Sequence, residues 1–390
     1  MKRSPIVLCS ALFALFAVDF RRQTAEGAKN AERETDQEWT SVKPGLELAF
    51  PADHGAHPSF RTEWWYVTGQ VTTEDGERFG FQFTVFRRGL DNRKPEPGAS
   101  PLRARAAFAG HLAVTDVAHG RTLFAERLRR SGAPLAVASE TDLDLVLEDW
   151  SLRRGPGAGA AAGAPPDRLT LSASDPALAI GLELELVPSK PLVLHGERGY
   201  SQKGAEPGNA SAYVSWTRLA TSGRLTVDGK ARSVHGESWF DHEFGSSVLG
   251  DETAGWDWFG LQLDDGRELM LFRLRRAPGS SERSGEPASA GTLIEQDGTT
   301  RALQREDFSI EVTERWTSPR THASYPAHWR ITLPDADLRL ELAPLAADCE
   351  LAARSTGTTY WEGPVQITGS TSGRGYAELT GYAGSLVPRF

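Results

Sequence analysis

The sequence has few cysteines and no block of basic residues. Only Cys9 and Cys349 occur among 390 residues, and Cys9 lies within an apolar N-terminal segment. If that segment is removed, Cys349 is left alone, so the remaining chain cannot form an intramolecular disulfide. Asp and Glu number 52 against 43 Lys and Arg, which gives a net charge of −9. We therefore expect no nucleic-acid partner, because such partners need concentrated basic side chains.

The chain also lacks an apolar run of the length that a membrane-spanning helix requires. Its N-terminal run, Pro5–Val18, falls short of the roughly 20 residues needed. Lys2 and Arg3 precede the run and polar residues follow it, as in a secretory signal peptide. Residues 1–28 are therefore predicted to be a signal peptide of a periplasmic or secreted protein, with an uncleaved membrane tether as the alternative. Residues 29–45 are predicted to be a flexible arm.

The sequence does contain many aromatic residues in strand-like patterns. Eleven Trp and 17 Phe against two Met favour aromatic-rich sheets over helical bundles. The stretch Glu63–Val71 is rich in aromatic and β-branched residues, and the pair Asp75-Gly76 then supplies a turn. After the turn, every second residue from Phe79 to Val85 is apolar, as in the return strand of a hairpin. Further strands, one of them at Leu143–Leu152, predict an all-β sandwich or barrel fold.

A pattern from the first half recurs in the second half, about 190 residues later. The pattern is an aromatic run, an Asp-Gly turn and a strand that ends in Phe-Arg. The first copy has Trp64-Trp65-Tyr66, Asp75-Gly76 and Phe86-Arg87. The second copy has Trp256-Asp257-Trp258-Phe259, Asp265-Gly266 and Phe272-Arg273. The recurrence predicts two similar β domains in tandem, at residues 46–242 and 243–390.

The densest polar cluster runs from His235 to Gly245. In an extended strand, one face carries His235, Glu237, Trp239, Asp241 and Glu243, and His242 lies on the other. Carboxylates crowded against aromatic side chains have raised pKa values and can act as general acids. Asp241 is predicted to be the acid, with His242 beside it to position water and Glu237 as a further catalytic candidate. The alternative is a hydrogen-bonded polar seam between two β domains. No His-x-His or His-x-x-x-His spacing occurs in this cluster, so no metal is predicted there.

The aromatic residues of the two hairpins form a second candidate site. Trp64 and Trp65 are adjacent, so they must point to opposite sides of their sheet. Indole and phenol faces bind apolar ligands and stabilise cations. The predicted ligand wall consists of Trp64, Trp65, Tyr66, Trp239, Trp256, Trp258 and Tyr360. The alternative is that many of these residues are ordinary barrel core.

Several stretches of the chain together resemble a known family, the AttH-like and carotenoid 1,2-hydratase (hydroxyneurosporene synthase) proteins. These stretches are Thr62–Gly69, Phe79–Gln82, Gly208–Ser211 followed by Tyr213 and Trp216, Ser238–Gly245, Trp256–Phe259, Tyr360–Gly363 and Gly375–Tyr382. They cover nearly all of the chain that follows the predicted signal peptide and arm.

The resemblance implies a fold and a class of activity. The fold would be two tandem lipocalin-like (calycin-type) antiparallel β-barrels that bind an apolar, isoprenoid- or lipid-like ligand without a cofactor. The activity would be acid-assisted hydration or cyclisation of an alkene, as in the carotenoid hydratases. The alternative is a non-catalytic periplasmic carrier of lipids or other hydrophobic ligands, associated with a membrane transporter.

Two low-complexity tracts are expected to be mobile and removable. Residues 155–166 are mostly Gly, Ala and Pro, and residues 279–290 are rich in Ser, Gly and Glu, so neither offers periodic apolar side chains. Deletion of residues 155–166 should therefore shift the melting temperature by only a few degrees, as measured by thermal unfolding. Loss of soluble protein on deletion would contradict this prediction.

Overall fold

The computed structural model describes residues 39–93, 98, 100, 103–155, 167–204, 208–246, 253–276 and 289–384. The predicted signal peptide lies outside this part of the chain, as do residues 156–166 and 279–288 of the low-complexity tracts. Residues 289 and 290, which the sequence placed in the second tract, instead begin a strand. The described residues form strands and three short 3-10 helices, Ala52–His54, Arg305–Asp307 and Pro334–Ala336. None of the helices in the described ranges has the length and hydropathy of a membrane span.

The last residues of the predicted arm are packed rather than loose. Residues 39–45 belong to the described part of the chain, and Val42 is buried in a small cluster with Phe60 and Phe244. The backbone N–H of Thr40 donates to the carbonyl oxygen of Ser59 at 3.0 Å. Burial of an apolar side chain therefore holds this end of the arm against the first barrel.

The first sheet has 13 antiparallel strands. They are β1 (Thr62–Thr73), β2 (Arg78–Gly89), β3 (Ala106–Asp116), β4 (Arg121–Arg130), β5 (Ala136–Ala138), β6 (Asp144–Leu147), β7 (Trp150–Arg154), β8 (Leu169–Asp175), β9 (Ile180–Pro188), β10 (Val193–Leu194), β11 (Tyr200–Gln202), β12 (Ala210–Val227) and β13 (Lys230–Gly245). Their order is β4-β3-β2-β1-β13-β12-β9-β8-β7-β6-β5, and β10 and β11 also pair with β12.

The second sheet has 10 antiparallel strands. They are β14 (Thr253–Leu263), β15 (Glu268–Arg276), β16 (Ser289–Ile294), β17 (Thr300–Leu303), β18 (Ser309–Thr317), β19 (Ser324–Leu333), β20 (Leu338–Pro344), β21 (Glu350–Ala353), β22 (Thr358–Gly369) and β23 (Gly373–Thr380). Their order is β17-β16-β15-β14-β23-β22-β20-β19-β18, and β21 pairs with β22.

The two sheets place their opening hairpins in the same way. In the first sheet, β1 lies between its hairpin partner β2 and the last strand, β13, and β12 follows. In the second sheet, β14 lies between β15 and the last strand, β23, and β22 follows. The recurrence seen in the sequence therefore marks equivalent strands of two similar sheets.

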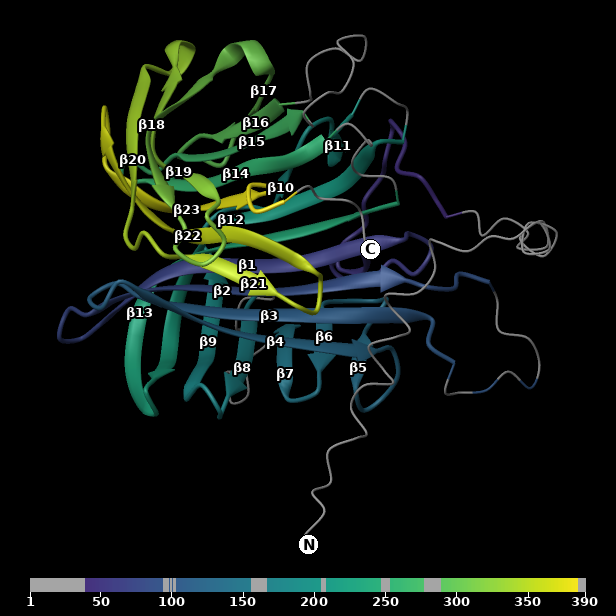
Figure 1. Ribbon diagram of the computed structural model, residues 1–390. Coiled ribbons are helices and arrows are strands. Elements are labelled where there is room, and N and C mark those ends of the chain that lie inside the picture. Colours follow the sequence, from purple (N-terminus) through teal and green to yellow (C-terminus); the bar gives the residue numbers. More distant parts are fainter. Residues whose placement is uncertain are drawn as a thin grey trace, which may run out of the picture. The chain divides into compact units, whose positions relative to one another are not determined.

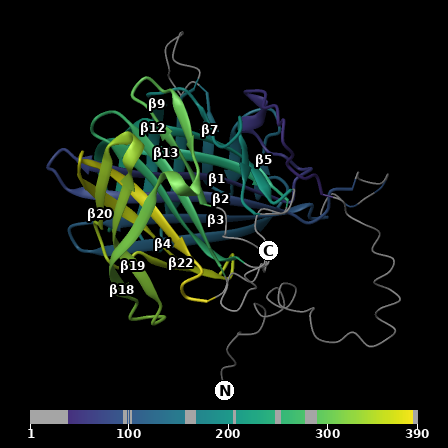
Figure 2. The ribbon, with the colours of Figure 1, turned by 90° about the horizontal axis from the view of Figure 1, so that it is seen from above.

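Each sheet is strongly curled, as Figure 1 and Figure 2 show, and each has its own apolar core. The first core contains Trp65, Phe83 and Phe240, and the second contains Phe259 and Trp329. Alternation along the strands supplies these residues, since every second side chain points inward. The predicted pair of lipocalin-like antiparallel barrels is confirmed.

One strand and one domain boundary differ from those predicted from the sequence. Residues Leu143–Leu152 form two strands, β6 and β7, because Glu148 adopts a left-handed conformation (φ 59°) and turns the chain between them. Strand β13 continues to Gly245, so the expected domain boundary between residues 242 and 243 falls inside it. The chain passes from the first sheet to the second between β13 and β14.

The outer faces of the two barrels meet within one compact unit, residues 39–390. Strands β1 and β2 contact β22 and β23, which lie above them in Figure 1. The Gln70 side-chain amide donates to the carbonyl oxygens of Val365 and Gly375 at 2.9 and 2.8 Å. At Gly80 the approach is so close that a Cβ atom would lie 2.6 Å from Pro364. The strands that fill the cores thus also build the interface, with their alternate side chains.

Candidate active site between the two barrels

Asp241 belongs to a row of polar side chains that crosses the first sheet on the face toward the second barrel. The strand register pairs Asp241 of β13 with Ser215 of β12 on one side and Tyr66 of β1 on the other. Tyr66 is paired with Thr84, and Thr84 with His111. Directly paired residues of antiparallel strands point to the same side, so these five side chains form one strip.

Three hydrogen bonds hold the Asp241 carboxyl group in place. Trp239 Nε1 donates to Oδ1 at 2.6 Å, Tyr213 Oη donates to Oδ2 at 2.9 Å, and Ser215 Oγ also contacts Oδ1. Trp258 of the second barrel donates its indole N–H to Tyr213 Oη at 3.0 Å. Asp241 is only 3% exposed. The prediction that Asp241 is buried beside an indole is therefore confirmed.

The environment of Asp241 favours the neutral acid. Burial raises its pKa to about 7, even though the hydrogen bonds from Ser215, Trp239 and Tyr213 favour the anion. The carboxylate of Glu243, two residues along the same face, adds to the rise. A carboxyl group with such a pKa can donate a proton near neutral pH.

A second acidic centre faces this strip from the other barrel. Glu362 of β22 and Glu378 of β23 are directly paired across their strands, and Tyr66 Oη donates to Glu362 Oε1 at 2.5 Å. Burial raises the pKa of Glu362 well above its usual range, and the neighbouring Glu378 raises it further. Burial also raises the pKa of Glu378 to about 7, and Asp241 contributes. Because two neighbouring carboxylates would repel each other, the Glu362–Glu378 pair retains a proton near neutral pH.

Aromatic side chains from both barrels surround these acids. The interface cluster consists of Tyr66, Tyr213, Trp239, Trp258, Met270, Phe272, Leu274 and Tyr376, with Trp64 and Trp256 packed against it. The Trp258 ring meets Trp239 and Tyr66 edge to face, with centroids 6.0 and 5.4 Å apart. Trp64, Trp256 and Glu378 keep part of their surface exposed, so the cluster reaches solvent at their end. Tyr360, also predicted in the wall, is buried and hydrogen-bonded to His111 Nδ1 at 2.8 Å.

One buried ammonium group lies within this cluster. Lys203 Nζ sits over the rings of Tyr213 and Phe272, 4.7 and 4.1 Å from their centroids. It is 3.4 Å from a carboxylate oxygen of Glu243, which also accepts a hydrogen bond from Ser211 Oγ. Lys203 therefore balances Glu243, while Asp241 is contacted by uncharged donors.

The structure separates three predicted site residues from Asp241. Trp65 and His242 point into the first barrel, where their rings stack with centroids 4.9 Å apart. Asp241 and His242 cannot meet because consecutive residues of a strand point to opposite faces. Glu237 forms an ion pair with Arg218 at 2.8 Å and lines an open groove of about 570 Å³ at the far rim of the interface. Of the three predicted catalytic residues, only Asp241 lies among the aromatic side chains.

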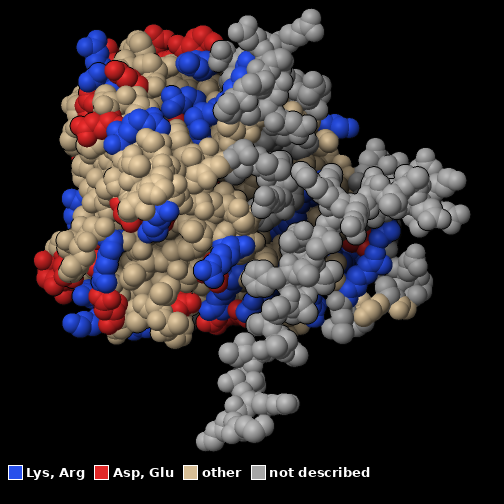
Figure 3. All heavy atoms as spheres, viewed as in Figure 1, with Lys and Arg blue, Asp and Glu red and all other residues tan. Residues whose placement is uncertain are grey.

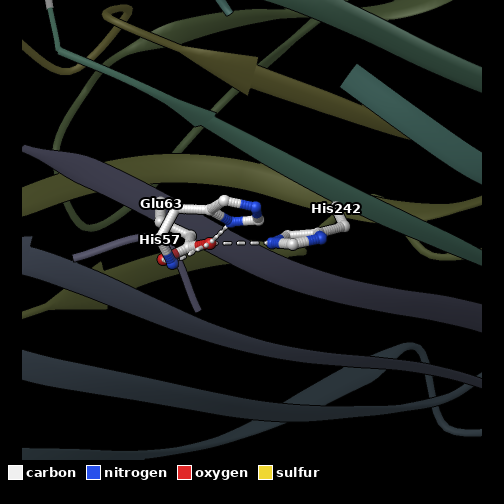
Figure 4. A group of neighbouring side chains, drawn as sticks. All are labelled: His57, Glu63 and His242. Carbon is white, nitrogen blue, oxygen red and sulfur yellow. Dashed lines mark hydrogen bonds and ion pairs between the residues drawn. The ribbon is translucent and has the colours of Figure 1, made fainter. Parts of the chain in front are cut away.

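The opposite face of β1 and β13 carries a separate charged cluster, shown in Figure 4. Glu63 Oε1 accepts hydrogen bonds from His57 Nδ1 at 2.7 Å and His242 Nε2 at 3.0 Å. Its other oxygen accepts from Arg87 Nε at 2.7 Å, and Glu63 is fully buried. These bonds hold the pKa of Glu63 well below its usual range despite burial.

His57, Glu63 and His242 are also a set of atoms that could hold a metal ion. One ligand atom from each lies within 4.8 Å of the others. Arg87, however, already supplies the positive charge that a metal would bring, and the imidazole groups satisfy the carboxylate by hydrogen bonding. This cluster is therefore explained as a buried ion pair that joins β1, β2 and β13 to the segment containing His57.

Most of the groups that contact Asp241 were not predicted as site residues from the sequence. Tyr213 was named only within a stretch that resembles the AttH-like family, and Ser215 was not named, although the two lie two residues apart on β12 and so share a face. Glu362 and Glu378 could have been recognised as candidate site residues, since each is the one acidic residue of a largely apolar strand. Their pairing depends on strand register, which the sequence does not state.

The Glu63 cluster predicts a large effect of a small substitution. Glu63→Gln keeps the side-chain shape but leaves Arg87 buried without its counter-ion, so we expect a loss of about 3–5 kcal/mol in the free energy of unfolding. Urea denaturation measures this loss. The control is Glu183→Gln in the exposed ion pair with Arg224, where the same change should cost less than about 1 kcal/mol. Equal losses in the two variants would contradict our account of the cluster.

The raised pKa of Asp241 predicts a pH-dependent effect on stability. Between its unfolded value near 4 and its folded value of about 7, the folded protein binds the proton more tightly, so this group destabilises the fold as pH rises. Asp241→Asn removes that contribution. The stability of the variant relative to the parent should therefore increase by about 1 kcal/mol per pH unit across this window. Urea denaturation at pH 5 and pH 8 measures the difference, and a pH-independent difference would refute the raised pKa.

Comparison with known proteins agrees with this architecture. A crystal structure of an AttH protein from Nitrosomonas europaea is 34% identical in sequence, covers 88% of this chain and 99% of its own, and has a TM-score of 0.75. Kievitone hydratase from Nectria haematococca shares the fold at 14% identity and a TM-score of 0.64, with 89% of this chain and 96% of its own covered. No curated protein matches the chain. The AttH-like family matches residues 41–382, and the chain belongs to this family.

Proposed function

We propose that this protein is an enzyme that uses Asp241 as a general acid on an apolar, alkene-containing substrate bound between the two barrels. The observation that carries the proposal is the burial of Asp241 against Trp239, with a pKa of about 7. A carboxyl group with an ordinary pKa would be ionised near neutral pH and could not donate a proton.

The surrounding residues suit acid-assisted addition of water. Transfer of the Asp241 proton to one alkene carbon leaves a carbocation at the other and a carboxylate on Asp241. The faces of Trp239, Trp258 and Tyr66 can stabilise that cation. Water then bonds to the cationic carbon, and its surplus proton goes to a carboxylate. When that group releases a proton to solvent and Asp241 takes one up, the enzyme is restored and the net change is addition of one water molecule to the alkene. Glu378, which keeps an opening to solvent, is placed to accept that proton.

The relatives favour the same reaction class. Kievitone hydratase, whose name describes a water-adding enzyme, has the same fold over nearly its whole length. The aromatic cluster between the barrels also suits an apolar molecule, in agreement with the isoprenoid- or lipid-like ligand expected from the sequence. We therefore favour hydration over cyclisation.

The second candidate function is that of an exported carrier of hydrophobic ligands. The observation that favours it is the large share of aromatic and aliphatic side chains in the interface cluster, which bind without chemistry. A carrier requires the aromatic wall and does not require a proton on Asp241. The two functions therefore differ in their dependence on Asp241.

Asp241→Asn separates these functions, because it preserves shape and removes the transferable proton. We expect binding of isoprenoid alkenes to be retained and hydration to fall by a factor of roughly 10²–10⁴. A panel from monoterpenes to carotenes is incubated in ¹⁸O-labelled water, with mass spectrometry for incorporated oxygen and quenching of tryptophan fluorescence for binding.

Glu237→Gln is the matched control, since Glu237 lies on the same strand but pairs with Arg218, and it should leave hydration unchanged. Full incorporation of label by Asp241→Asn would remove Asp241 as the acid. Ligand binding by parent and variant alike, with no labelled product from either, would establish the carrier function instead.

A further inference from the structure

The hydrogen bonds around Asp241 leave only one place for an acidic proton. Trp239 Nε1 contacts Oδ1 and can only donate. At Oδ2, Tyr213 Oη accepts a hydrogen bond from Trp258 Nε1, which also can only donate. Among the described residues, Asp241 is the acceptor that lies within hydrogen-bond distance of the Tyr213 hydroxyl group. Trp239 and Tyr213 are therefore both hydrogen-bond donors to the carboxyl group, and neither can accept its proton.

The third contact, Ser215, is the one that can reverse its direction. Its Oγ contacts Asp241 Oδ1 and also lies 2.7 Å from His195 Nε2. If the Ser215 hydrogen points to Asp241, the carboxyl group has three donors and no acceptor, so the anion is favoured. If that hydrogen points to His195, a lone pair of Ser215 is free to accept the acidic proton of Asp241.

His195 is held in a position to receive that hydrogen. It follows β10, is fully buried, and contacts Thr292 Oγ1 of the second barrel through Nδ1 at 2.8 Å. With its hydrogen on Nδ1, directed to Thr292, the ring presents a bare Nε2 to Ser215. Burial, with Lys203 nearby, lowers the pKa of His195 to about 3, so the ring is neutral and one nitrogen carries no hydrogen.

We propose that His195 is a positioning residue that keeps Asp241 in its acid form by accepting the hydroxyl hydrogen of Ser215. This inference rests on the proposed role of Asp241 as the acid and adds the residue that sets its protonation. The His195 ring packs against Tyr213 with centroids 4.3 Å apart, and its backbone N–H donates to the Tyr213 carbonyl oxygen at 3.0 Å. Its two side-chain hydrogen bonds go to Ser215 and Thr292, so it acts on Asp241 through Ser215. Because Thr292 belongs to β16, the arrangement also makes the acid form depend on the docking of the second barrel.

Other titratable groups face Asp241 and His195 and must be held constant in a test. Glu243 lies on the same strand as Asp241, Tyr66 on β1, Tyr213 on β12, Glu378 on β23 and Glu362 on β22, and Lys203 faces His195. The substitutions below leave all of them in place.

The test measures the pKa of Asp241 directly, in the full chain labelled with ¹³C at aspartate carboxyl groups. Its resonance is assigned by its loss in Asp241→Asn. His195→Phe fills the space without accepting a hydrogen bond, so Ser215 turns to Asp241 and the acid dissociation constant should rise at least tenfold. His195→Gln offers an amide oxygen to Ser215 and should keep the constant within about threefold of the parent.

The double variant His195→Phe/Ser215→Ala shows whether the effect passes through Ser215. In the Ser215→Ala background, loss of His195 should leave the dissociation constant of Asp241 unchanged. An unchanged constant in His195→Phe, or a shift that persists without Ser215, would overturn the inference. If His195→Phe does not fold, His195→Gln is compared with His195→Asn, whose shorter amide cannot reach Ser215. A tenfold difference between their dissociation constants for Asp241 supports the inference, and equal constants overturn it.

The same measurements separate this inference from the proposed function. If Asp241→Asn abolishes hydration but His195→Phe does not move the dissociation constant, Asp241 is the acid and His195 has no positioning role. If His195→Phe moves the constant as expected but the parent hydrates no alkene, the positioning role stands and the protein is a carrier.

Discussion

The placement of three acidic side chains between two sheets, with Asp241 and Glu362 buried and Glu378 partly exposed, is the constraint on which the interface depends. On the face shown in Figure 3, acidic and basic side chains are intermixed. Exposed ion pairs of the protein, such as Glu183 with Arg224, compensate each other. Between the barrels, Asp241 and Glu362 are contacted by hydroxyl and indole groups instead of cations. Carboxyl groups in such surroundings avoid the cost of a buried charge by keeping their protons.

The two faces of strands β1 and β13 hold buried carboxyl groups in opposite protonation states. On the inner face of β1 and β13, Glu63 is ionised because Arg87 and two imidazole groups donate to it. On the outer face, one residue before His242, burial raises the pKa of Asp241, and its neutral donors offset that rise only in part. The inner cluster stabilises the first barrel, and the outer strip supplies reactive protons to the interface. Strand alternation keeps the two systems apart, since a one-residue step reverses the face.

Much of this architecture was predictable from local sequence pattern. The alternation of apolar residues from Phe79 to Val85 and the repeated Asp-Gly turns predicted the hairpins, and their recurrence predicted two barrels. The face containing Trp239 and Asp241 was predicted because it depends only on the two-residue period of a strand. The same rule could have excluded His242 from the site of Asp241. It could not show that Glu237 is held by Arg218, because Arg218 lies where the register of the β12–β13 hairpin shifts, and alternation within one strand does not specify that shift.

The sequence by itself determined which side chains share a face, because that depends on backbone geometry within one strand. Only the tertiary structure decided which faces meet. The contact of Tyr66 with Glu362 joins residues 296 positions apart, and that of His195 with Thr292 joins residues 97 positions apart. Such contacts arise from strand register and from the packing of one barrel on the other. The protonation of Asp241 follows from them, because burial and the direction of each hydrogen bond are properties of the assembled interface.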